Sequence, residues 1–255
     1  MPSVPAARNV LRVIIYLSDQ TGPTHAATIA RDLDLPRSSV YHLLTALQDA
    51  GFLLHFPEER SYALSPLLGE LGSSVDRAGR LRRLGAPLLA RLIAEAPVPV
   101  VAQIGTLSGT DVVYAAKESG LRAPATVSAI GVRLPAHLTA TGRAILAALD
   151  RAQVRALFPT ADALAVRGAS GPRTMRAFEA TLQTARERGW ASERDEITAG
   201  YASVAAAALD RRGTPVAAVT LTYRTAVVDA ATEQLLGQAT RRGAAALSQR
   251  MQGRR

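Results

Sequence analysis

Apolar residues recur at helical spacing in three short stretches of the first fifty residues. A spacing of i, i+3, i+4 and i+7 places side chains on one side of a helix, so each stretch predicts a helix with one buried face. The three stripes are Val10, Val13, Ile14 and Leu17; Ala26, Ile29, Ala30 and Leu33; and Val40, Leu43, Leu44 and Leu47. We expect Thr24 to cap the second helix and Asp34-Leu35-Pro36 to end it, because proline disfavours helical backbone in the preceding residue.

A strand pair is predicted directly after the third stripe. Gly51 stands where the third helix should end, and residues 52–56 and 61–64 flank the turn-forming segment Pro57-Glu58-Glu59-Arg60. Three helices with a tight turn between the second and third, closed by a hairpin, make a winged helix-turn-helix over residues 1–65. The alternative is an ordinary small helical domain, which would bury the same stripes.

The third predicted helix is polar on the side opposite its apolar stripe. At about 100° per residue, that side or its flank carries Arg37, Ser38, Tyr41, His42 and Thr45. Such side chains can hydrogen-bond to base edges and phosphates, whereas a merely solvated face usually carries Glu and Lys. Asp49 is the only acidic residue in the stretch. We therefore expect DNA contacts from Arg37, Ser38, Ser39, Tyr41, His42 and Thr45, and from Arg60 in the hairpin turn.

Residues 66–96 predict a linker helix between two halves of the chain. Leucines recur along the segment, and we expect the helix to be interrupted near Gly79 or Gly85. Its arginines could contact phosphates, although a solvated helix face is the favoured interpretation.

Strand and helix patterns alternate from Val98 onward. We expect strands at 98–106, 111–117, 123–130, 191–198, 202–209 and 215–224, and helices at 139–149, 151–158, 174–188 and 231–251. A mostly antiparallel sheet with helices outside it makes an α+β domain over residues 97–255.

The net charge of +9 does not by itself locate a nucleic-acid surface. Residues 1–65 hold five Arg and six acidic residues, a net charge of −1, whereas residues 151–255 hold sixteen Arg and nine acidic residues, a net charge of +7. The distribution of charge alone would therefore suggest a nucleic-acid surface in the C-terminal part of the chain and not in the predicted winged helix. Lys117 is the only lysine among 30 cationic residues, a bias that we attribute to coding composition.

Composition also narrows the class of protein. No run of 18 apolar residues predicts a membrane span, and arginines interrupt the first seventeen residues, so we expect a cytoplasmic protein without a signal peptide. The lack of cysteine rules out disulfides, thiolate nucleophiles and cysteine-ligated metals, and four histidines argue against a histidine-rich metal site. We expect neither a metal nor a cofactor.

Candidate catalytic groups are sparse. The G-x-S-x-G, Walker A, G-x-G-x-x-G and H-E-x-x-H patterns are all missing, and His137 is the only histidine of the larger domain. Glu193, Asp195 and Glu196 lie close in sequence, but such spacing is common on surfaces. A binding site is better supported at residues 134–144, where small residues precede a predicted helix whose first amides can hold an anion. The alternative there is that Thr139 or Thr141 only caps the helix.

Segments in both halves resemble the IclR family of bacterial transcription regulators, from about Arg8 to Ser248. The first half carries IARDLDLPRSSVYHLL at 29–44, LQDAGFL at 47–53 and the strand Tyr62-Ala63-Leu64. The second half carries GVRLPAHLTATGRA at 131–144, RERGWA at 186–191 and Arg194-Asp195-Glu196.

The resemblance implies a DNA-binding regulator with a winged helix-turn-helix, a linker helix and a GAF-like effector domain. It further implies a homodimer or homotetramer on a near-palindromic operator of double-stranded DNA, modulated by a small metabolite such as an organic acid. Two other functions stay open: an enzyme whose N-terminal helices serve only for association, and a sensor that has lost DNA binding.

Carried over position by position, the resemblance implies an effector pocket. Its residues would be Ala140, Thr141, Gly142, Glu193, Ser203, Thr220 and Thr222. The family often has Asp at position 193, Cys at 203, and Ser at 220 and 222, so four positions keep their polarity but change in size. The identity of the ligand therefore does not carry over.

Overall fold

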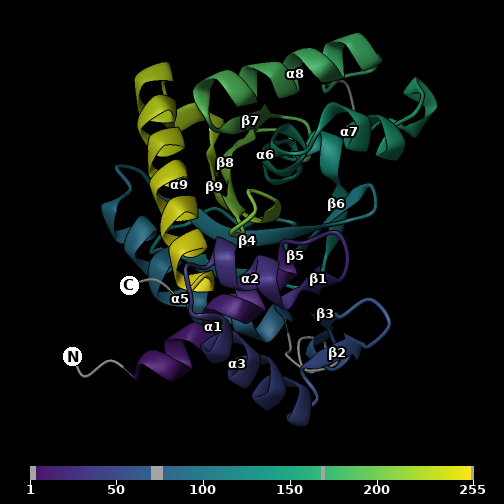
Figure 1. Ribbon diagram of the computed structural model, residues 1–255. Helices are drawn as coiled ribbons and strands as arrows, with labels where there is room; N and C mark the ends of the chain where they lie inside the picture. The colour runs from purple at the N-terminus through teal and green to yellow at the C-terminus, as the bar shows by residue number, and fades with distance from the viewer. Residues whose placement is uncertain (1–3, 70–76, 168–169, 254–255) are drawn as a thin grey trace. The chain divides into compact units, whose positions relative to one another are not determined.

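The computed structural model describes residues 4–69, 77–167 and 170–253. The chain divides into two compact units, a first unit Met1–Asp76 and a second unit Arg77–Arg255 (Figure 1). Among the described residues, no helix is long and apolar enough to cross a membrane.

The first unit is a winged helix-turn-helix, as the sequence predicts. Its elements are α1 (Pro5–Ser18), β1 (Thr24–His25), α2 (Ala26–Asp32), α3 (Arg37–Asp49), β2 (Leu53–Phe56) and β3 (Ser61–Leu64). The buried side chains of its core come mainly from the three apolar stripes, with Leu53 and Tyr62 added from the hairpin. Gly51 follows α3 with φ +77°, the left-handed conformation that glycine adopts easily after a helix end.

The expected capping role of Thr24 is wrong. Thr24 lies in β1 and pairs with Tyr62 of β3, and α2 begins after His25, whose side chain does not cap the helix. Pairing with the wing strand β3 therefore places Thr24 in a strand, where the sequence pattern predicted a helix cap.

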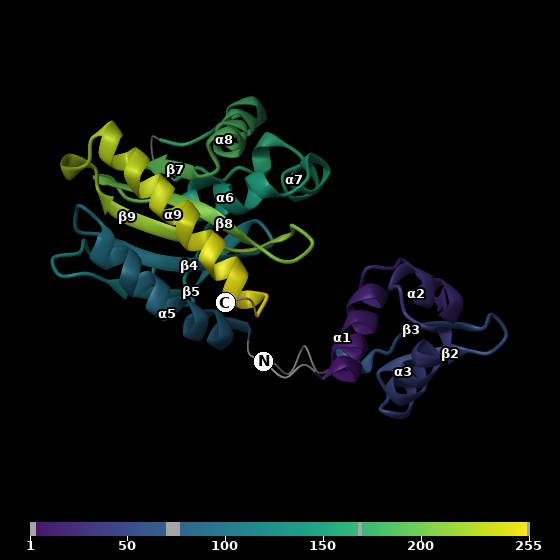
Figure 2. The same cartoon turned by 60° about the vertical axis from the view of Figure 1, so that its left-hand side comes forward.

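The second unit is an α+β domain built on one antiparallel sheet of order β6-β5-β4-β9-β8-β7. The strands are β4 (Val101–Ser108), β5 (Asp111–Ser119), β6 (Arg133–Pro135), β7 (Ala191–Arg194), β8 (Tyr201–Leu209) and β9 (Pro215–Arg224). Figure 2 shows α5 (Arg77–Glu95) and α9 (Ala230–Met251) on one face of the sheet. The other face carries α6 (Ala140–Ala148), α7 (Arg151–Leu157) and α8 (Met175–Arg188).

Side-chain alternation along β9 separates the two faces of the sheet. Val219, Leu221 and Tyr223 join the core under α5 and α9. Ala218 packs with the apolar residues of α6 on the other face, and the intervening Thr220 and Thr222 share that side because successive strand residues point in opposite directions. The threonine hydroxyls are thus presented toward α6.

The expected interruption near Gly79 or Gly85 is also wrong, because α5 continues through both positions. A Cβ at Gly85 would collide with the Ile104 side chain of β4. Gly85 therefore allows the helix to approach the sheet closely rather than breaking it. Residues 70–76 of the predicted linker lie outside the described part of the chain.

Two strand predictions need correction. Residues 123–130, predicted as a strand, are irregular, because the side chain of Ser128 bonds to Gln103 and β6 occupies the edge of β5 instead. The strand predicted at 191–198 ends at Arg194, since Asp195 adopts φ +60° and the chain turns there.

Candidate DNA-binding face and ligand pocket

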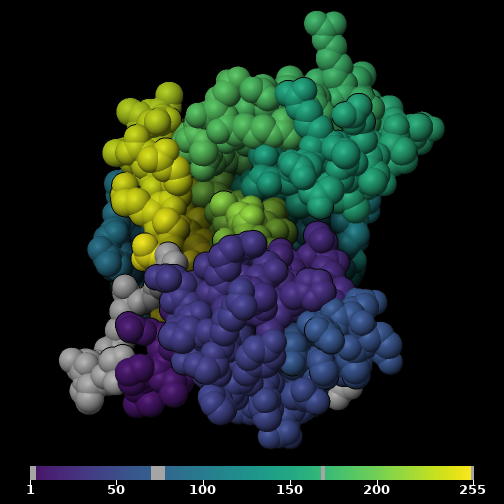
Figure 3. Space-filling model, in the orientation of Figure 1, coloured from purple at the N-terminus to yellow at the C-terminus, as the bar shows by residue number. Residues whose placement is uncertain are grey.

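The polar side of α3 is open to solvent. Arg37, Ser38, Tyr41, His42 and Thr45 are exposed and Ser39 is half-buried, while Val40, Leu44 and Leu47 are buried in the core. Figure 3 shows the dark blue segment that holds α3 on the surface of the first unit. The amphipathic pattern thus leaves one face of α3 free to meet a partner.

Charge on this face is neutral to basic. The first turn of α3 has no acidic residue, and its one acid, Asp49, is the last residue of the helix. Arg60 is exposed in the β2–β3 turn, where it adopts φ +50°. The Thr45 hydroxyl donates to the Tyr41 carbonyl at 3.0 Å, which leaves its lone pairs free to accept.

A small pocket lies on the α6 face of the sheet in the second unit. Its lining comes from the strands, the start of α6 and two loop segments: Tyr114, Thr126, Val127, Ser128, Leu134, Thr139, Ala140, Glu193, Ile197, Thr198, Tyr201, Ser203 and Thr222. The cavity volume is about 30 Å³, room for about two water molecules. Any ligand larger than this would have to widen the pocket.

Four of the seven expected pocket residues line this cavity: Ala140, Glu193, Ser203 and Thr222. The other three are buried outside the lining. The Thr141 and Thr220 hydroxyls bond to each other at 2.7 Å, and the Tyr114 hydroxyl lies 3.3 Å from that of Thr141. These contacts fix α6 on the sheet.

Gly142 allows the start of α6 to pack closely against the preceding backbone. Its amide donates to the Thr139 hydroxyl at 2.9 Å, so that amide is already satisfied. A Cβ at Gly142 would overlap the backbone of Ala136. The amides of Ala140 and Thr141 are the first two of α6 and have no partner within their own helix. Any anion at this helix end would therefore meet these two amides.

Glu193 brings a carboxyl group to the pocket wall. The Ser203 hydroxyl donates to Glu193 Oε1 at 2.7 Å and lies 3.0 Å from the Thr222 hydroxyl, and the Glu196 amide donates to Glu193 Oε2 at 3.4 Å. Burial raises the pKa of Glu193 to about 7, outweighing the lowering effect of the Ser203 hydrogen bond. The pocket therefore holds a carboxyl group that changes charge near neutral pH.

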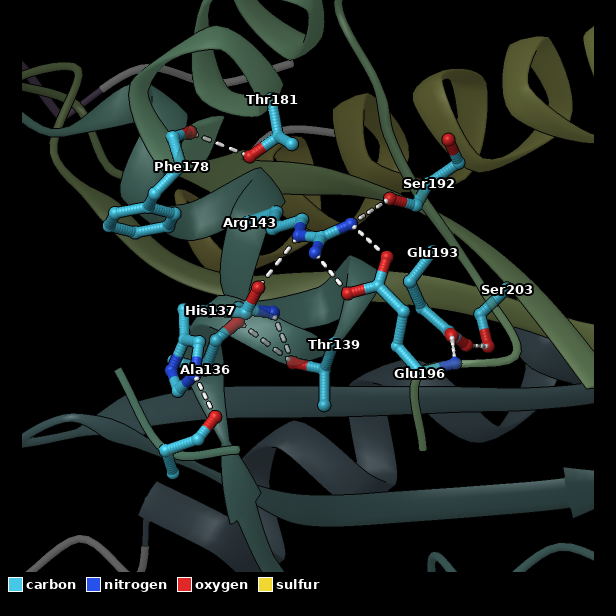
Figure 4. A network of polar contacts seen from close by, with 12 residues as sticks. Ala136, His137, Thr139, Arg143, Phe178, Thr181, Ser192, Glu193, Glu196 and Ser203 are labelled. Atoms are coloured by element: carbon cyan, nitrogen blue, oxygen red, sulfur yellow. Dashed lines mark hydrogen bonds and ion pairs between the residues drawn. The ribbon is translucent and has the colours of Figure 1, made fainter. Parts of the chain in front are cut away.

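A buried ion pair stands beside Glu193 (Figure 4). Both guanidinium NH groups of Arg143 bond to the Glu196 carboxylate, and the two residues are 3% and 8% exposed. Arg143 Nη1 also donates to the Ser192 carbonyl at 2.9 Å, and Nε donates to the His137 carbonyl at 2.8 Å. One side chain thus ties α6, β7, the loop after β7 and the turn before α6 together.

His137 has a structural setting. Its Nε2 lies 2.9 Å from the Ala165 carbonyl, and its ring meets Phe158 and Phe178 edge to face. Burial lowers the pKa of His137, so the neutral ring donates from Nε2 at neutral pH. In the described part of the chain, no group of three or more His, Asp or Glu side chains is placed to hold a metal ion.

Sequence reasoning missed the loop residues of the pocket and the Arg143–Glu196 pair. No periodic signal marks Thr126, Val127 or Ser128, because they lie in an irregular segment. A signal did exist for Arg143: it is the one charged residue of α6, within a run of small and apolar side chains. A lone charge in such a helix predicts a buried partner.

Comparisons with known proteins agree with this arrangement. Residues 78–249 match the family model described as "Bacterial transcriptional regulator IclR C-terminal", and residues 6–55 match that described as "IclR helix-turn-helix domain". The HTH-type transcriptional regulator XynR of Escherichia coli (strain K12) is 28% identical over 229 residues, which cover 90% of each chain.

Solved structures show the same fold. The Thermotoga maritima IclR aligns with a TM-score of 0.63 at 20% identity, covering 98% of this chain and 99% of that chain. An IclR homolog from Microbacterium hydrocarbonoxydans, complexed with 4-hydroxybenzoate, aligns with a TM-score of 0.59 at 20% identity, covering 95% and 97%.

Proposed function

Since the chain belongs to the IclR family of bacterial transcriptional regulators, we propose that it reads an operator with α3 and responds to a small metabolite in the second unit. Residues 1–65 form the DNA-binding domain, residues 66–96 the linker and residues 97–255 the effector-binding domain. We expect the protein to act in the cytoplasm, where bacterial DNA lies.

The exposed face of α3 is the observation that carries the DNA-binding assignment. Recognition helices enter the major groove and contact base edges with a few side chains, while arginines fix the register on phosphates. Ser38, His42 and Thr45 present such groups, and we expect the exposed Arg37 and Arg60 to contact phosphates. The surrounding net charge of −1 makes these placed contacts, rather than bulk attraction, the source of affinity.

Replacing Thr45 with alanine tests this assignment. We expect affinity for the operator to fall by about 1–3 kcal/mol, the usual contribution of a specific base contact. The operator is first isolated from random DNA duplexes with the full chain, and binding is then measured by fluorescence anisotropy. Thr184→Ala is the matched control, because the Thr184 hydroxyl also donates to a carbonyl four residues back, on α8. Equal binding by both variants would contradict the assignment.

We propose that the protein binds DNA as a dimer through α1. Leu11 and Ile15 of α1 are 59% and 37% exposed and lie one helical turn apart, and the N-cap residue Val4 is 66% exposed, so α1 and its N-cap carry apolar side chains outside the core. Exposed apolar side chains grouped along one side of a helix are typical of a protein interface. Two copies would place two α3 helices on half-sites about one DNA turn apart.

Leu11→Glu should therefore weaken both self-association and DNA binding. A buried carboxylate at the interface is costly, so we expect monomers in light-scattering measurements and operator affinity at least about tenfold lower. Gln20→Glu, an exposed change just beyond α1, supplies the control. A monomeric wild-type protein, or a dimeric variant, would show that α1 is not the interface.

The pocket chemistry favours a small carboxylate-bearing metabolite. The Ser203 and Thr222 hydroxyls and the Ala140 amide can hydrogen-bond an anion, while Glu193 in its neutral form does not repel it. The 4-hydroxybenzoate bound by the Microbacterium homolog is a molecule of this class. Because a ligand shifts an equilibrium only by differential binding, the effector must prefer one conformation of the protein. We favour this role over turnover of a metabolite.

Ser203→Leu should abolish effector binding and leave operator binding intact. Leucine fills the cavity of about 30 Å³ and removes the hydroxyl between Glu193 and Thr222. A library of small carboxylic acids is screened by thermal shift against wild type and variant, and the operator affinity of each is measured. Ser119→Leu is the control, since Ser119 is exposed at the end of β5. An acid that stabilises wild type and Ser203→Leu equally would place the site elsewhere.

A further inference from the structure

Three chain segments converge at one end of the second unit: the start of α5, the end of α9 and the turn between β8 and β9. Arg250 Nη1 of α9 donates to the Leu84 carbonyl of α5 at 2.9 Å. The Leu209 amide, just before the turn, donates to the Ser248 hydroxyl at 2.8 Å. Figure 2 shows α5 and α9 side by side on this face of the sheet.

This end of the unit is strongly basic. We call it the basic end, defined by the exposed residues Arg80, Arg82, Arg83, Arg211 and Arg250. The sequence has no Asp or Glu at all in residues 77–94 and 234–255. Asp210, the acid of the β8–β9 turn, accepts hydrogen bonds from the amides of residues 212 and 214. In the described part of the chain, no ion pair involves Arg80, Arg82 or Arg83.

Solvation alone does not explain this distribution. Solvated helices usually interleave charges of both signs, as the far end of α5 does where Arg91 bonds to Glu95 at 2.7 Å. A coding bias accounts for arginine in place of lysine, but not for the loss of every acid from two long stretches. Like charges held together by the fold repel one another, and a polyanion would relieve that repulsion.

The basic end also lies close to the DNA-binding unit along the chain. Gly69 is the last described residue before the connection and Arg77 is the first after it. Eight peptide steps span at most about 29 Å, which is less than one turn of double-stranded DNA (about 34–36 Å), so the start of α5 can reach sequence beside a half-site. The length of this connection therefore allows the basic end to contact DNA that α3 binds.

We propose that the basic end binds the phosphate backbone of double-stranded DNA flanking the sequence read by α3. This inference rests on the proposed DNA-binding function and extends it to the second unit, Arg77–Arg255. The contacts are sequence-independent, since arginines on phosphates fix position and release counterions without reading bases. They also give the ligand-binding unit a direct contact with the operator.

The test compares two triple variants of the full chain. Arg80→Gln, Arg82→Gln and Arg83→Gln remove three charges from the basic end. Arg155→Gln, Arg167→Gln and Arg176→Gln remove three exposed charges from the α7–α8 segment, on the other side of the sheet. Both are titrated with the selected operator, once trimmed to the recognised core and once with flanking sequence. Trp190 fluorescence checks that each variant is folded.

On the flanked operator, we expect the basic-end variant to bind at least about tenfold more weakly than wild type, with a salt dependence reduced by about 0.9 in log–log slope per lost phosphate contact. On the trimmed operator, wild type and variant should bind alike, and hydroxyl-radical footprints should lose only their flanks. The α7–α8 variant should match wild type on both duplexes.

Several results would overturn the inference and identify what failed. Unchanged flanked binding and footprint in the basic-end variant, with Thr45→Ala still defective, would reject the basic end and leave the proposed function standing. A wild-type protein that selects no duplex would reject both. Wild-type binding to phosphatidylglycerol vesicles that the basic-end variant loses, with unchanged DNA binding, would assign the surface to a membrane instead.

Discussion

Replacing Arg143 with methionine is expected to lower the free energy of unfolding of the second unit by about 3–5 kcal/mol. The change leaves the buried Glu196 carboxylate without its bidentate partner, and it frees the carbonyls of His137 and Ser192 as well. An uncompensated charge in a buried site costs far more than an exposed ion pair contributes. Urea denaturation followed by Trp190 fluorescence reports this directly, because the single tryptophan is buried in the same unit.

Two comparisons make this result specific to the buried pair. Arg133→Met breaks the exposed pair with Asp111, whose nitrogen and oxygen lie 3.3 Å apart, and should cost less than about 1 kcal/mol. The double variant Arg143→Met with Glu196→Met should recover much of the loss, since two apolar side chains leave no orphaned charge. A single variant as stable as wild type would mean that water compensates Glu196 at this site.

The winged helix-turn-helix was predictable because each of its helices buries a single stripe. Val13, Ile29 and Leu44 are fully buried, as the helical spacing requires, and the turn residues Pro36 and Gly51 lie at the predicted boundaries. The same spacing also fixed which side of α3 is exposed. What periodicity could not predict was β1, a two-residue strand that exists only because Thr24 meets Tyr62 across the fold.

The pocket was predictable only where it lies on regular structure. Strand alternation places Thr220 and Thr222 on one face, and the small residues before α6 mark a helix start. The rest depends on tertiary contacts. Lys117 donates a hydrogen bond to Thr126, which is 9 positions away, and Gln103 bonds to Ser128, which is 25 positions away. Contacts between residues so far apart leave no local pattern in the sequence. A segment fixed by such side-chain bonds resembles neither helix nor strand in sequence.

The charges of Arg143, Glu196 and Glu193 are compatible with the proposed binding of an anion in a pocket next to two carboxylates. The Arg143 guanidinium neutralises Glu196, so that pair presents no net charge. No cation of the described residues bonds to Glu193, whose partners are the Ser203 hydroxyl and the Glu196 amide. Its charge is therefore set by pH, and an anionic effector would meet a neutral wall below the pKa of Glu193 and a negative one above it.

Glu193→Gln is expected to stabilise the protein at pH 8 and leave it nearly unchanged at pH 5. The pKa of Glu193 is about 7 in the folded chain, against an ordinary value of 4.5. The folded state therefore binds one more proton than the unfolded state between these two values, and stability falls as pH rises from about 4.5 to 7 and then levels off. A shift of this size corresponds to a loss on the order of 3 kcal/mol. Glutamine stays neutral throughout and should remove that loss.

Urea denaturation at half-unit steps from pH 5 to 8, again followed by Trp190 fluorescence, measures the effect. The difference in unfolding free energy between variant and wild type should be within about 1 kcal/mol at pH 5 and should grow to about 2–3 kcal/mol by pH 8. Glu118→Gln is the control, because Glu118 is exposed on β5 and its removal should leave the wild-type profile unchanged. A constant difference across this range would mean that Glu193 keeps one charge state throughout, and an anionic effector would then bind with no dependence on that carboxyl group.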